Sequence, residues 1–165
     1  LDTLYISGCY YMRKMIISKH ISYKEATRSI TAKRLGIENT PSEEHITSMQ
    51  ILAEKVFEPL RSQVGKPICI NSMYRSGELN KAIGGSKTSQ HCKGQAMDID
   101  DKYGYATNAE MFEFIKDNLS FDQLIWEFGT DDNPDWLHIS YVSEEENRNI
   151  MLKAYKNKGR TAYKK

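Results

Sequence analysis

Residues 89–100 read SQHCKGQAMDID and combine a histidine, a turn signal and a strand pattern. From Ala96 onward the residues alternate in character, which predicts a short strand with Asp98 on one face. A carboxylate in a half-buried strand is costly unless a partner offsets its burial. His91 precedes Asp98 by seven residues, and Gly94 permits a sharp turn between them. We therefore expect the imidazole and the carboxylate to converge.

A second alternating segment supplies a third candidate ligand. Residues 135–141 read DWLHISY, which predicts a strand with His138 on its more polar face. Two histidines and one carboxylate, with a fourth position open, are the ligand set of a catalytic zinc ion. We therefore predict that His91, Asp98 and His138 hold one zinc ion per chain. A structural ion pair between His91 and Asp98 is the alternative, and the third ligand argues against it.

The composition is that of a globular protein. A chain of 165 residues can bury a core within one domain, and its net charge of +1 argues against a dedicated nucleic-acid binder. No apolar run approaches the length of a transmembrane helix. Cys9, Cys69 and Cys92 are an odd, irregularly spaced set, which is not a disulfide framework. Cys92 follows His91 directly and should point away from it, so we expect it to be a bystander.

The two ends of the chain differ from its middle. Residues 1–20 are predicted to be an N-terminal segment without an assigned role, and residues 21–165 a single domain. Arg13 and Lys14 follow a mildly apolar stretch, which is the wrong order for a signal peptide. Residues 148–165 contain seven Lys or Arg and no acid. A solvated edge strand is the simpler interpretation of this tail, and weak contact with an anionic cell-wall polymer is the alternative.

Capping signals and apolar spacing predict helices mainly in the first half and strands mainly in the second. The expected helices cover about 23–35, a long segment that starts at a 40–43 capping box and is bent or ended by Pro59, 76–83 and 107–118. The expected strands cover 68–72, 96–100, 123–128, 136–142 and a hairpin of 150–155 with 160–163. Short connections between them favour an α+β fold, with a small antiparallel sheet that carries the zinc site and is flanked by helices.

The chain resembles the zinc D-alanyl-D-alanine carboxypeptidase family. That family also contains phage endolysins that cut the L-alanyl–D-glutamate bond, and it shares its fold with the Hedgehog signalling domain. The resemblance rests on S-x-H-x-x-G-x-A-x-D at 89–98 and D-x-x-H at 135–138. It runs from about residue 24 to 141 and includes Y-R-S at 74–76 and L-I-W-E-F-G at 124–129.

The resemblance implies roles for individual residues. It implies zinc bound by His91, Asp98 and His138, a catalytic carboxylate at Asp135 and a substrate-binding arginine at Arg75.

Three neighbouring residues are expected to support the site. Ser89 would shape the loop or accept a hydrogen bond from a ligand, and Trp136 would belong to the core or the pocket wall. Glu127 is open to two interpretations: it orients Arg75 or a ligand, or it rivals Asp135 as the base. We favour support.

Together these observations predict a zinc metallopeptidase that hydrolyses amide bonds in bacterial peptidoglycan stem peptides by metal-activated water. The enzyme would be a D-Ala-D-Ala carboxypeptidase or an L-Ala–D-Glu endopeptidase of the endolysin type. The alternative is a non-catalytic, zinc-containing module that binds the cell wall or belongs to a virion. The expected partner is the stem peptide, with no nucleic acid and no membrane span. The place of action stays open between the cytoplasm, a phage-infected cell and the cell envelope.

Overall fold

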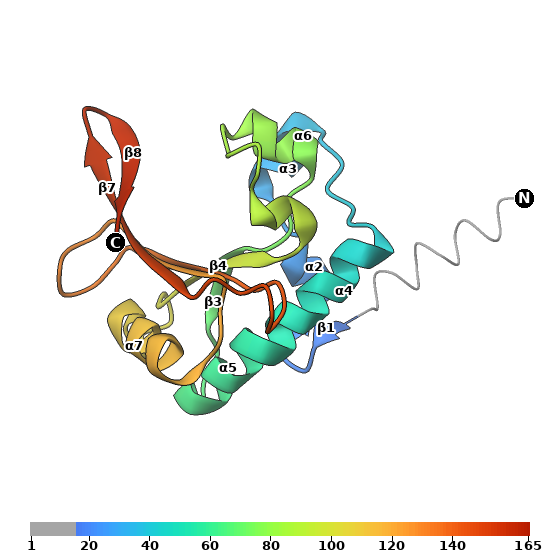
Figure 1. The fold of residues 1–165 in the computed structure, drawn as a ribbon. Coiled ribbons are helices and arrows are strands. Elements are labelled where there is room, and N and C mark those ends of the chain that lie inside the picture. The colour runs from blue at the N-terminus through green and yellow to red at the C-terminus, as the bar shows by residue number, and fades with distance from the viewer. Residues whose placement is uncertain (1–15) are drawn as a thin grey trace, which may run out of the picture.

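The computed structural model describes residues 16–165, which form an α+β fold around a mixed six-stranded sheet (Figure 1). The strand order is β3-β4-β6-β5-β7-β8. The strands are β3 (Cys69–Ser72), β4 (Ala96–Asp100), β5 (Gln123–Glu127), β6 (Trp136–Ser140), β7 (Ile150–Asn157) and β8 (Arg160–Lys164). The predicted α+β class is confirmed.

One pair of strands departs from the predicted antiparallel sheet. All neighbours in the six-stranded sheet are antiparallel except β5 and β7, which run parallel. The reason is the connection after β6, because residues 141–149 carry the chain across the start of β5, where Gln123 pairs with both Ser140 and Ile150. A strand that reverses after β6 and pairs on the far side of β5 must run parallel to β5.

The described chain begins with a small hairpin of β1 (Ile16–Ser18) and β2 (Ile21–Ser22). Ile17 and Ile21 are buried in the main hydrophobic core. The domain boundary expected at residue 20 therefore falls inside this hairpin, and we propose that the folded domain includes residues 16–20. The rest of the predicted N-terminal segment lies outside the described residues.

The helix expected over residues 23–35 is two helices, so that prediction is wrong. They are α2 (Tyr23–Ala26) and α3 (Ile30–Leu35). The side chain of Asn39 donates a 2.9 Å hydrogen bond to the carbonyl of Thr27, which holds the chain between them. Ser29 then starts the second helix by accepting a hydrogen bond from the backbone N–H of Ala32.

The long amphipathic helix is continuous through three segments. These are α4 (Glu43–Leu52), the π-helical segment η1 (Ala53–Phe57) and α5 (Glu58–Val64), and Ser42 caps the start. Pro59 was expected to bend or end this helix; it does not end it, because α5 runs on to residue 64. Proline lacks an N–H and crowds the carbonyl four residues back. In the π-helical turn that precedes Pro59, backbone N–H groups bond to the carbonyl five residues back instead of four. The ordinary hydrogen-bond pairing of the α-helix is therefore changed there.

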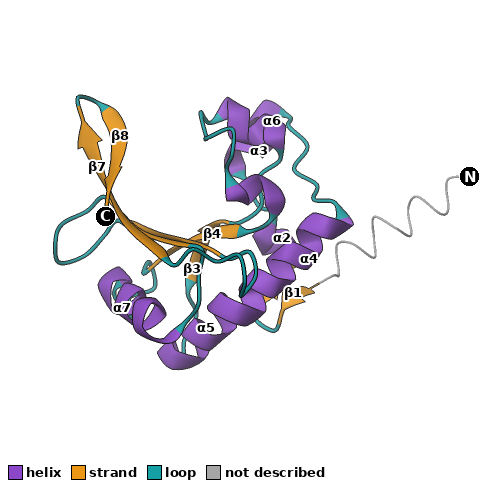
Figure 2. Cartoon of the chain, viewed as in Figure 1, coloured by secondary structure: helices purple, strands orange, loops and turns teal. Residues whose placement is uncertain are grey.

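The sheet has a core face and an open face. Helices α4 and α5, together with α7 (Asn108–Asn118), cover the core face, where Met97, Ile99 and Leu137 are completely buried (Figure 2). The helix predicted at 107–118 is confirmed with its capping box.

Helix α6 (Gly77–Ala82) and the short turn η2 (Gln90–Lys93) lie near the open face. In the described part of the chain, no helix is both long enough and apolar enough to cross a membrane.

Candidate metal centre

The turn η2 places His91 beside the sheet. This 3-10 turn ends at Gly94, whose φ is 69°. A Cβ atom at Gly94 would lie 2.3 Å from the carbonyl oxygen of His45, so glycine is required there for space as well as for conformation. The sharp turn predicted between His91 and Asp98 is therefore present, and it directs the imidazole back toward β4.

A backbone carbonyl fixes the orientation of His91. The Nδ1 atom of His91 lies 2.6 Å from the carbonyl oxygen of Met73. Because a carbonyl can only accept, Nδ1 carries the proton and Nε2 presents its lone pair to the site. Burial lowers the pKa of His91, which favours the neutral form that a metal ligand needs. The contact uses the backbone carbonyl of Met73 and not its side chain, so it could not be predicted from the sequence.

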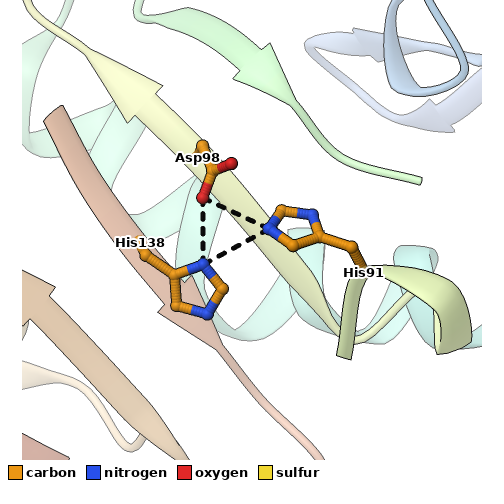
Figure 3. Close-up of side chains that lie close together, drawn as sticks. All are labelled: His91, Asp98 and His138. Atoms are coloured by element: carbon orange, nitrogen blue, oxygen red, sulfur yellow. Dashed lines mark hydrogen bonds and ion pairs between the residues drawn. The ribbon is translucent and has the colours of Figure 1, made fainter. Parts of the chain in front are cut away.

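Strand register brings the other two ligand candidates together. Asp98 of β4 and His138 of β6 are direct partners in the antiparallel ladder, so both side chains lie on the open face. Oδ1 of Asp98 is 2.9 Å from Nδ1 of His138 and 3.2 Å from Nε2 of His91 (Figure 3). The two ring nitrogens are 3.3 Å apart. The predicted convergence of these three residues is therefore present in the fold.

The three atoms form a suitable donor set for one cation. Ligand atoms of a tetrahedral zinc ion, each at about 2.0–2.2 Å from it, are separated from one another by roughly 3.3–3.6 Å. The observed separations are close to these values. Among the described residues, His91, Asp98 and His138 are the cluster whose ligand atoms all lie within 4.8 Å of one another. Cys92 is not in that cluster, in agreement with its expected bystander role.

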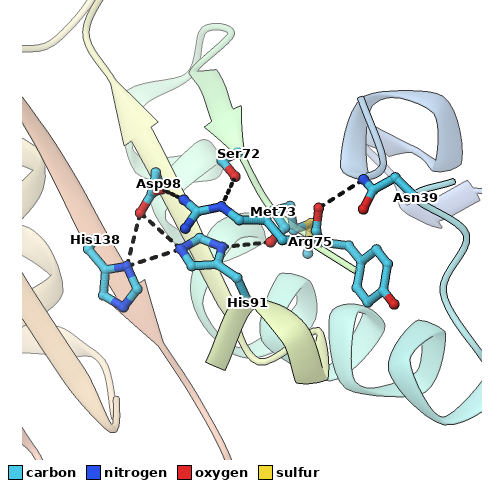
Figure 4. Close-up of polar contacts among 8 residues, drawn as sticks. Asn39, Ser72, Met73, Arg75, His91, Asp98 and His138 are labelled. Carbon is cyan, nitrogen blue, oxygen red and sulfur yellow. Dashed lines mark hydrogen bonds and ion pairs between the residues drawn. The ribbon is translucent and has the colours of Figure 1, made fainter. Parts of the chain in front are cut away.

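Arg75 holds the other oxygen of the candidate carboxylate ligand. Its Nη2 atom lies 2.5 Å from Oδ2 of Asp98, and its Nε atom donates to the hydroxyl of Ser72 at 2.9 Å (Figure 4). Burial opposes ionisation of Asp98, yet the contacts with His91 and His138 hold the pKa of Asp98 below its ordinary value. The sequence placed Arg75 near the site but did not reveal that it contacts a candidate ligand.

The candidate metal site opens onto a cleft of about 860 Å³. Its walls come from the 83–90 segment on one side and from the ends of β5 and β6, with the β7–β8 hairpin, on the other. Ser89, Glu127 and Trp136 all line this cleft, so the three supporting residues predicted from the sequence lie around the site. The ring of Trp136 packs against that of Phe128, with centroids 5.4 Å apart.

The two candidate bases occupy different environments. Glu127 lies in the cleft wall with 7% of its surface exposed, and burial raises its pKa to about 7. Because Ile125 pairs with His138, Glu127 shares the face of His138 two residues farther along β5. Asp135 is exposed and is not among the residues that line the cleft. Its backbone N–H donates to the carbonyl of Glu127 at 3.0 Å.

The remaining histidines of the chain have structural partners. Nδ1 of His20 lies 2.6 Å from a carboxylate oxygen of Glu58. His45 completes the cap at the start of α4 and packs against the ring of Tyr74. Neither belongs to the cluster of His91, Asp98 and His138, as expected from the sequence.

Comparison with known proteins identifies the family. The family model described as Peptidase M15 matches residues 19–140, well over half of the 165 residues. The matched segment contains His91, Asp98 and His138, and a His–Asp–His set is consistent with zinc in this family. A search of curated proteins found no match. The chain belongs to the Peptidase M15 family, which implies a metal-dependent peptidase.

Proposed function

We propose that this protein is a zinc-dependent peptidase that hydrolyses amide bonds in bacterial peptidoglycan stem peptides. The observation that carries the proposal is the convergence of His91, Asp98 and His138 on one point beneath an open cleft. The choice of substrate class rests on the resemblance of residues 89–98 and 135–138 to the zinc D-Ala-D-Ala carboxypeptidases and the L-Ala–D-Glu endolysins.

His91 Nε2, Asp98 Oδ1 and His138 Nδ1 would hold one zinc ion per chain, and three protein ligands would leave a coordination position for water or substrate. When bound, zinc lowers the pKa of water to about 7 and polarises a carbonyl group. The Met73 carbonyl and Arg75 support this arrangement, because each fixes one ligand through the atom that does not face the ion.

We assign proton transfer to Glu127 in preference to Asp135. Glu127 shares the sheet face of His138 and lines the cleft, whereas Asp135 is exposed outside the cleft lining. A carboxylate with a pKa near 7 can take a proton from the attacking water and return it to the leaving amine. Asp135, the base that the resemblance implies, is the second candidate. Glu127→Gln and Asp135→Asn separate the two.

We assign two roles to Arg75. It positions Asp98, and it also lines the cleft with donors beyond the two that contact Ser72 and Asp98. Those donors can bind a substrate carboxylate or a developing oxyanion, which is the substrate role that the sequence predicts for Arg75.

A non-catalytic module that binds the cell wall is the second candidate function. The environment of Glu127 argues against it, since burying an ionisable carboxylate costs free energy and a binding module has no use for a base. A binding module would also retain intact peptidoglycan instead of releasing fragments from it.

Product analysis tests the proposed function. The zinc-loaded chain is incubated with purified peptidoglycan and with a stem pentapeptide that ends in D-Ala-D-Ala, and the products are identified by mass spectrometry. Loss of one alanine identifies a carboxypeptidase, and a new amino-terminal D-glutamate identifies an endopeptidase. The metal-stripped chain is the control. If the zinc-loaded chain binds peptidoglycan but yields neither product, the proposed hydrolase is wrong and the binding module is supported.

A further inference from the structure

The β7–β8 hairpin lies beyond the part of the chain that matches the peptidase family. The match ends at residue 140, and the hairpin spans residues 150–164. Leu152, Thr161 and Tyr163 of this hairpin nevertheless line the same cleft as the metal site. In Figure 1 the hairpin rises at one end of the sheet, across from α6 and α3. The hairpin therefore adds a wall to the cleft that the matched segment does not contain.

Strand register places Tyr163 in line with Glu127. Glu127 pairs with Ala154 of β7, and Ala154 pairs with Tyr163 of β8. The three side chains therefore share one face of the sheet, and the Cα atoms of Glu127 and Tyr163 are about 10 Å apart at ordinary strand spacing. Ala154, which lies between them in the sheet, is itself buried. Tyr163 is 51% exposed although it lines the cleft.

A cation lies on the same face of the hairpin, beside the residues that line the cleft. Lys156 alternates with Ala154 and so lies on the same face, opposite Thr161. Its Nζ atom is 3.2 Å from the hydroxyl of Thr161 and 4.8 Å from the ring centroid of Phe128. Neither contact is with an anion, and Lys156 forms no ion pair among the described residues, although its charge lowers the pKa of the nearby Glu127. Lys156 is therefore able to pair with an anion.

The tyrosine hydroxyl is suited to donating a hydrogen bond. Burial raises the pKa of Tyr163, and the charges of Glu127 and Asp98 raise it further. The hydroxyl therefore keeps its proton at neutral pH and can donate to a carbonyl oxygen of a peptide.

We propose that Leu152, Lys156, Thr161 and Tyr163, the cleft face of the β7–β8 hairpin, form a binding subsite for an acidic peptide. Tyr163 contacts the peptide near the scissile bond, and Lys156 pairs with one of its carboxylates. The inference rests on the proposed peptidase function. It adds that these four residues determine which peptides the enzyme binds.

The opposite face of the same hairpin supplies matched controls. Tyr155 and Lys164 alternate with the subsite residues and lie on the other face, where Lys164 is 6.0 Å from the ring centroid of Tyr155. Tyr155→Ala and Lys164→Met therefore make the same chemical changes as Tyr163→Ala and Lys156→Met without altering the cleft. Equal zinc affinity in all four variants would show that the metal site is intact in each.

The test measures peptide binding, not turnover. The probe is the stem pentapeptide L-Ala-γ-D-Glu-L-Lys-D-Ala-D-Ala, compared with two versions amidated at either the D-glutamate α-carboxylate or the C-terminus. Stopped-flow tryptophan fluorescence reports binding to the zinc-loaded chain before the first turnover, since Trp136 lines the cleft. Tyr163→Ala should raise Kd about tenfold for every probe, and Tyr155→Ala by less than twofold.

Comparison of the two amidated peptides identifies which peptide carboxylate Lys156 binds. The unmodified chain should bind one of the two amidated peptides three- to tenfold more weakly than the unamidated peptide. Lys156→Met should bind that amidated peptide and the unamidated peptide equally. Lys164→Met should keep the preference. The inference is overturned if Tyr163→Ala behaves like Tyr155→Ala, or if Lys156→Met keeps the preference for the acid. Failure of the proposed hydrolysis would appear instead as absent products in the mass-spectrometric assay, which these binding measurements do not require.

Discussion

Arg75 and Asp98 are joined so that the two oxygens of one carboxylate have separate tasks. Oδ2 of Asp98 contacts Nη2 of Arg75 at 2.5 Å, while Oδ1 faces the ring nitrogens of His91 and His138. Since both residues of this ion pair are largely buried, the contact restricts the carboxylate to one orientation. We therefore propose that Arg75 acts on the candidate metal site by orienting Asp98.

Arg75→Met should weaken zinc binding by about 10- to 100-fold, because an outer partner that orients a ligand is lost. Arg75→Lys keeps the charge but not the planar fork, so its zinc affinity should fall less. Competition with a coloured zinc chelator measures both affinities. If zinc affinity is unchanged in both variants and only KM rises, Arg75 serves the substrate alone, as the sequence resemblance implies.

Glu127→Gln should lower turnover by about 10²- to 10⁴-fold while zinc and peptide binding stay near normal, since the amide cannot accept a proton. Asp135→Asn, the matched change in the other candidate, should lower turnover only a few-fold. Steady-state kinetics together with zinc content decide between them. Normal turnover in Glu127→Gln with an inactive Asp135→Asn would return the role of base to Asp135.

The pH dependence of kcat/KM should carry the signature of Glu127. Burial raises its pKa to about 7, so the base becomes protonated and activity falls as the pH drops through that region. A bound cation favours the ionised carboxylate, which moves this acid limb to or below pH 7 in the zinc-loaded enzyme. The limb should disappear from the residual activity of Glu127→Gln. A limb that persists there with the same midpoint belongs to another group.

The three candidate ligands could be identified from the sequence because each stands in a recognisable local pattern. The alternation around Asp98 and His138 and the turn at Gly94 each follow from residue type and spacing. Asp135 and Glu127 could not be ranked in this way. Their exposure depends on the register of β5 with β6 and on the walls of the cleft, which are long-range features.

Other features could not be predicted from the sequence, for different physical reasons. The bond from His91 to Met73 uses a backbone carbonyl, which any residue could supply. Proline normally ends a helix, but the helix continues through Pro59 after a π-helical segment. No residue pattern in the sequence predicts that segment. The role proposed for Tyr163 follows from its register with Ala154, which a basic, alternating tail sequence does not reveal.

Gly94→Ala should destabilise the fold by about 2 kcal/mol or more, because the new Cβ meets the carbonyl of His45 and the backbone φ is positive. Gly36→Ala is the matched control, since Gly36 has a φ of 67° but open space around it. Its cost should be about 1–2 kcal/mol, from backbone conformation alone. Urea unfolding of the two variants measures the difference. Equal losses would mean that the close approach to His45 carries no cost.

Arg148→Met should destabilise the chain by about 1–2 kcal/mol at pH 7, a modest value because half of the arginine side chain is exposed. Arg148 donates to both oxygens of the buried Asp122, and Gln90 donates to one of them from the start of η2. The hydrogen bond from Arg148 is the main cause that lowers the pKa of Asp122.

This contribution should depend on pH. Because the pKa of Asp122 is lower in the folded than in the unfolded state, its stabilisation is present above about pH 4 and is lost as the pH falls through the folded value. The stability difference between Arg148→Met and the unmodified chain should therefore shrink below pH 4. Urea unfolding at pH 7 and pH 3 checks this, and an equal difference at both values would assign the effect to packing.

Zinc titration of the metal-stripped chain tests most directly whether His91, Asp98 and His138 form the catalytic metal site. Hydrolysis of a stem peptide should return in proportion to added zinc and reach its plateau at about one equivalent per chain. His138→Ala should neither bind zinc tightly nor regain activity, because it removes one of three ligands. Full activity in the metal-stripped chain, or a His138→Ala variant that recovers with the same stoichiometry, would contradict the assignment.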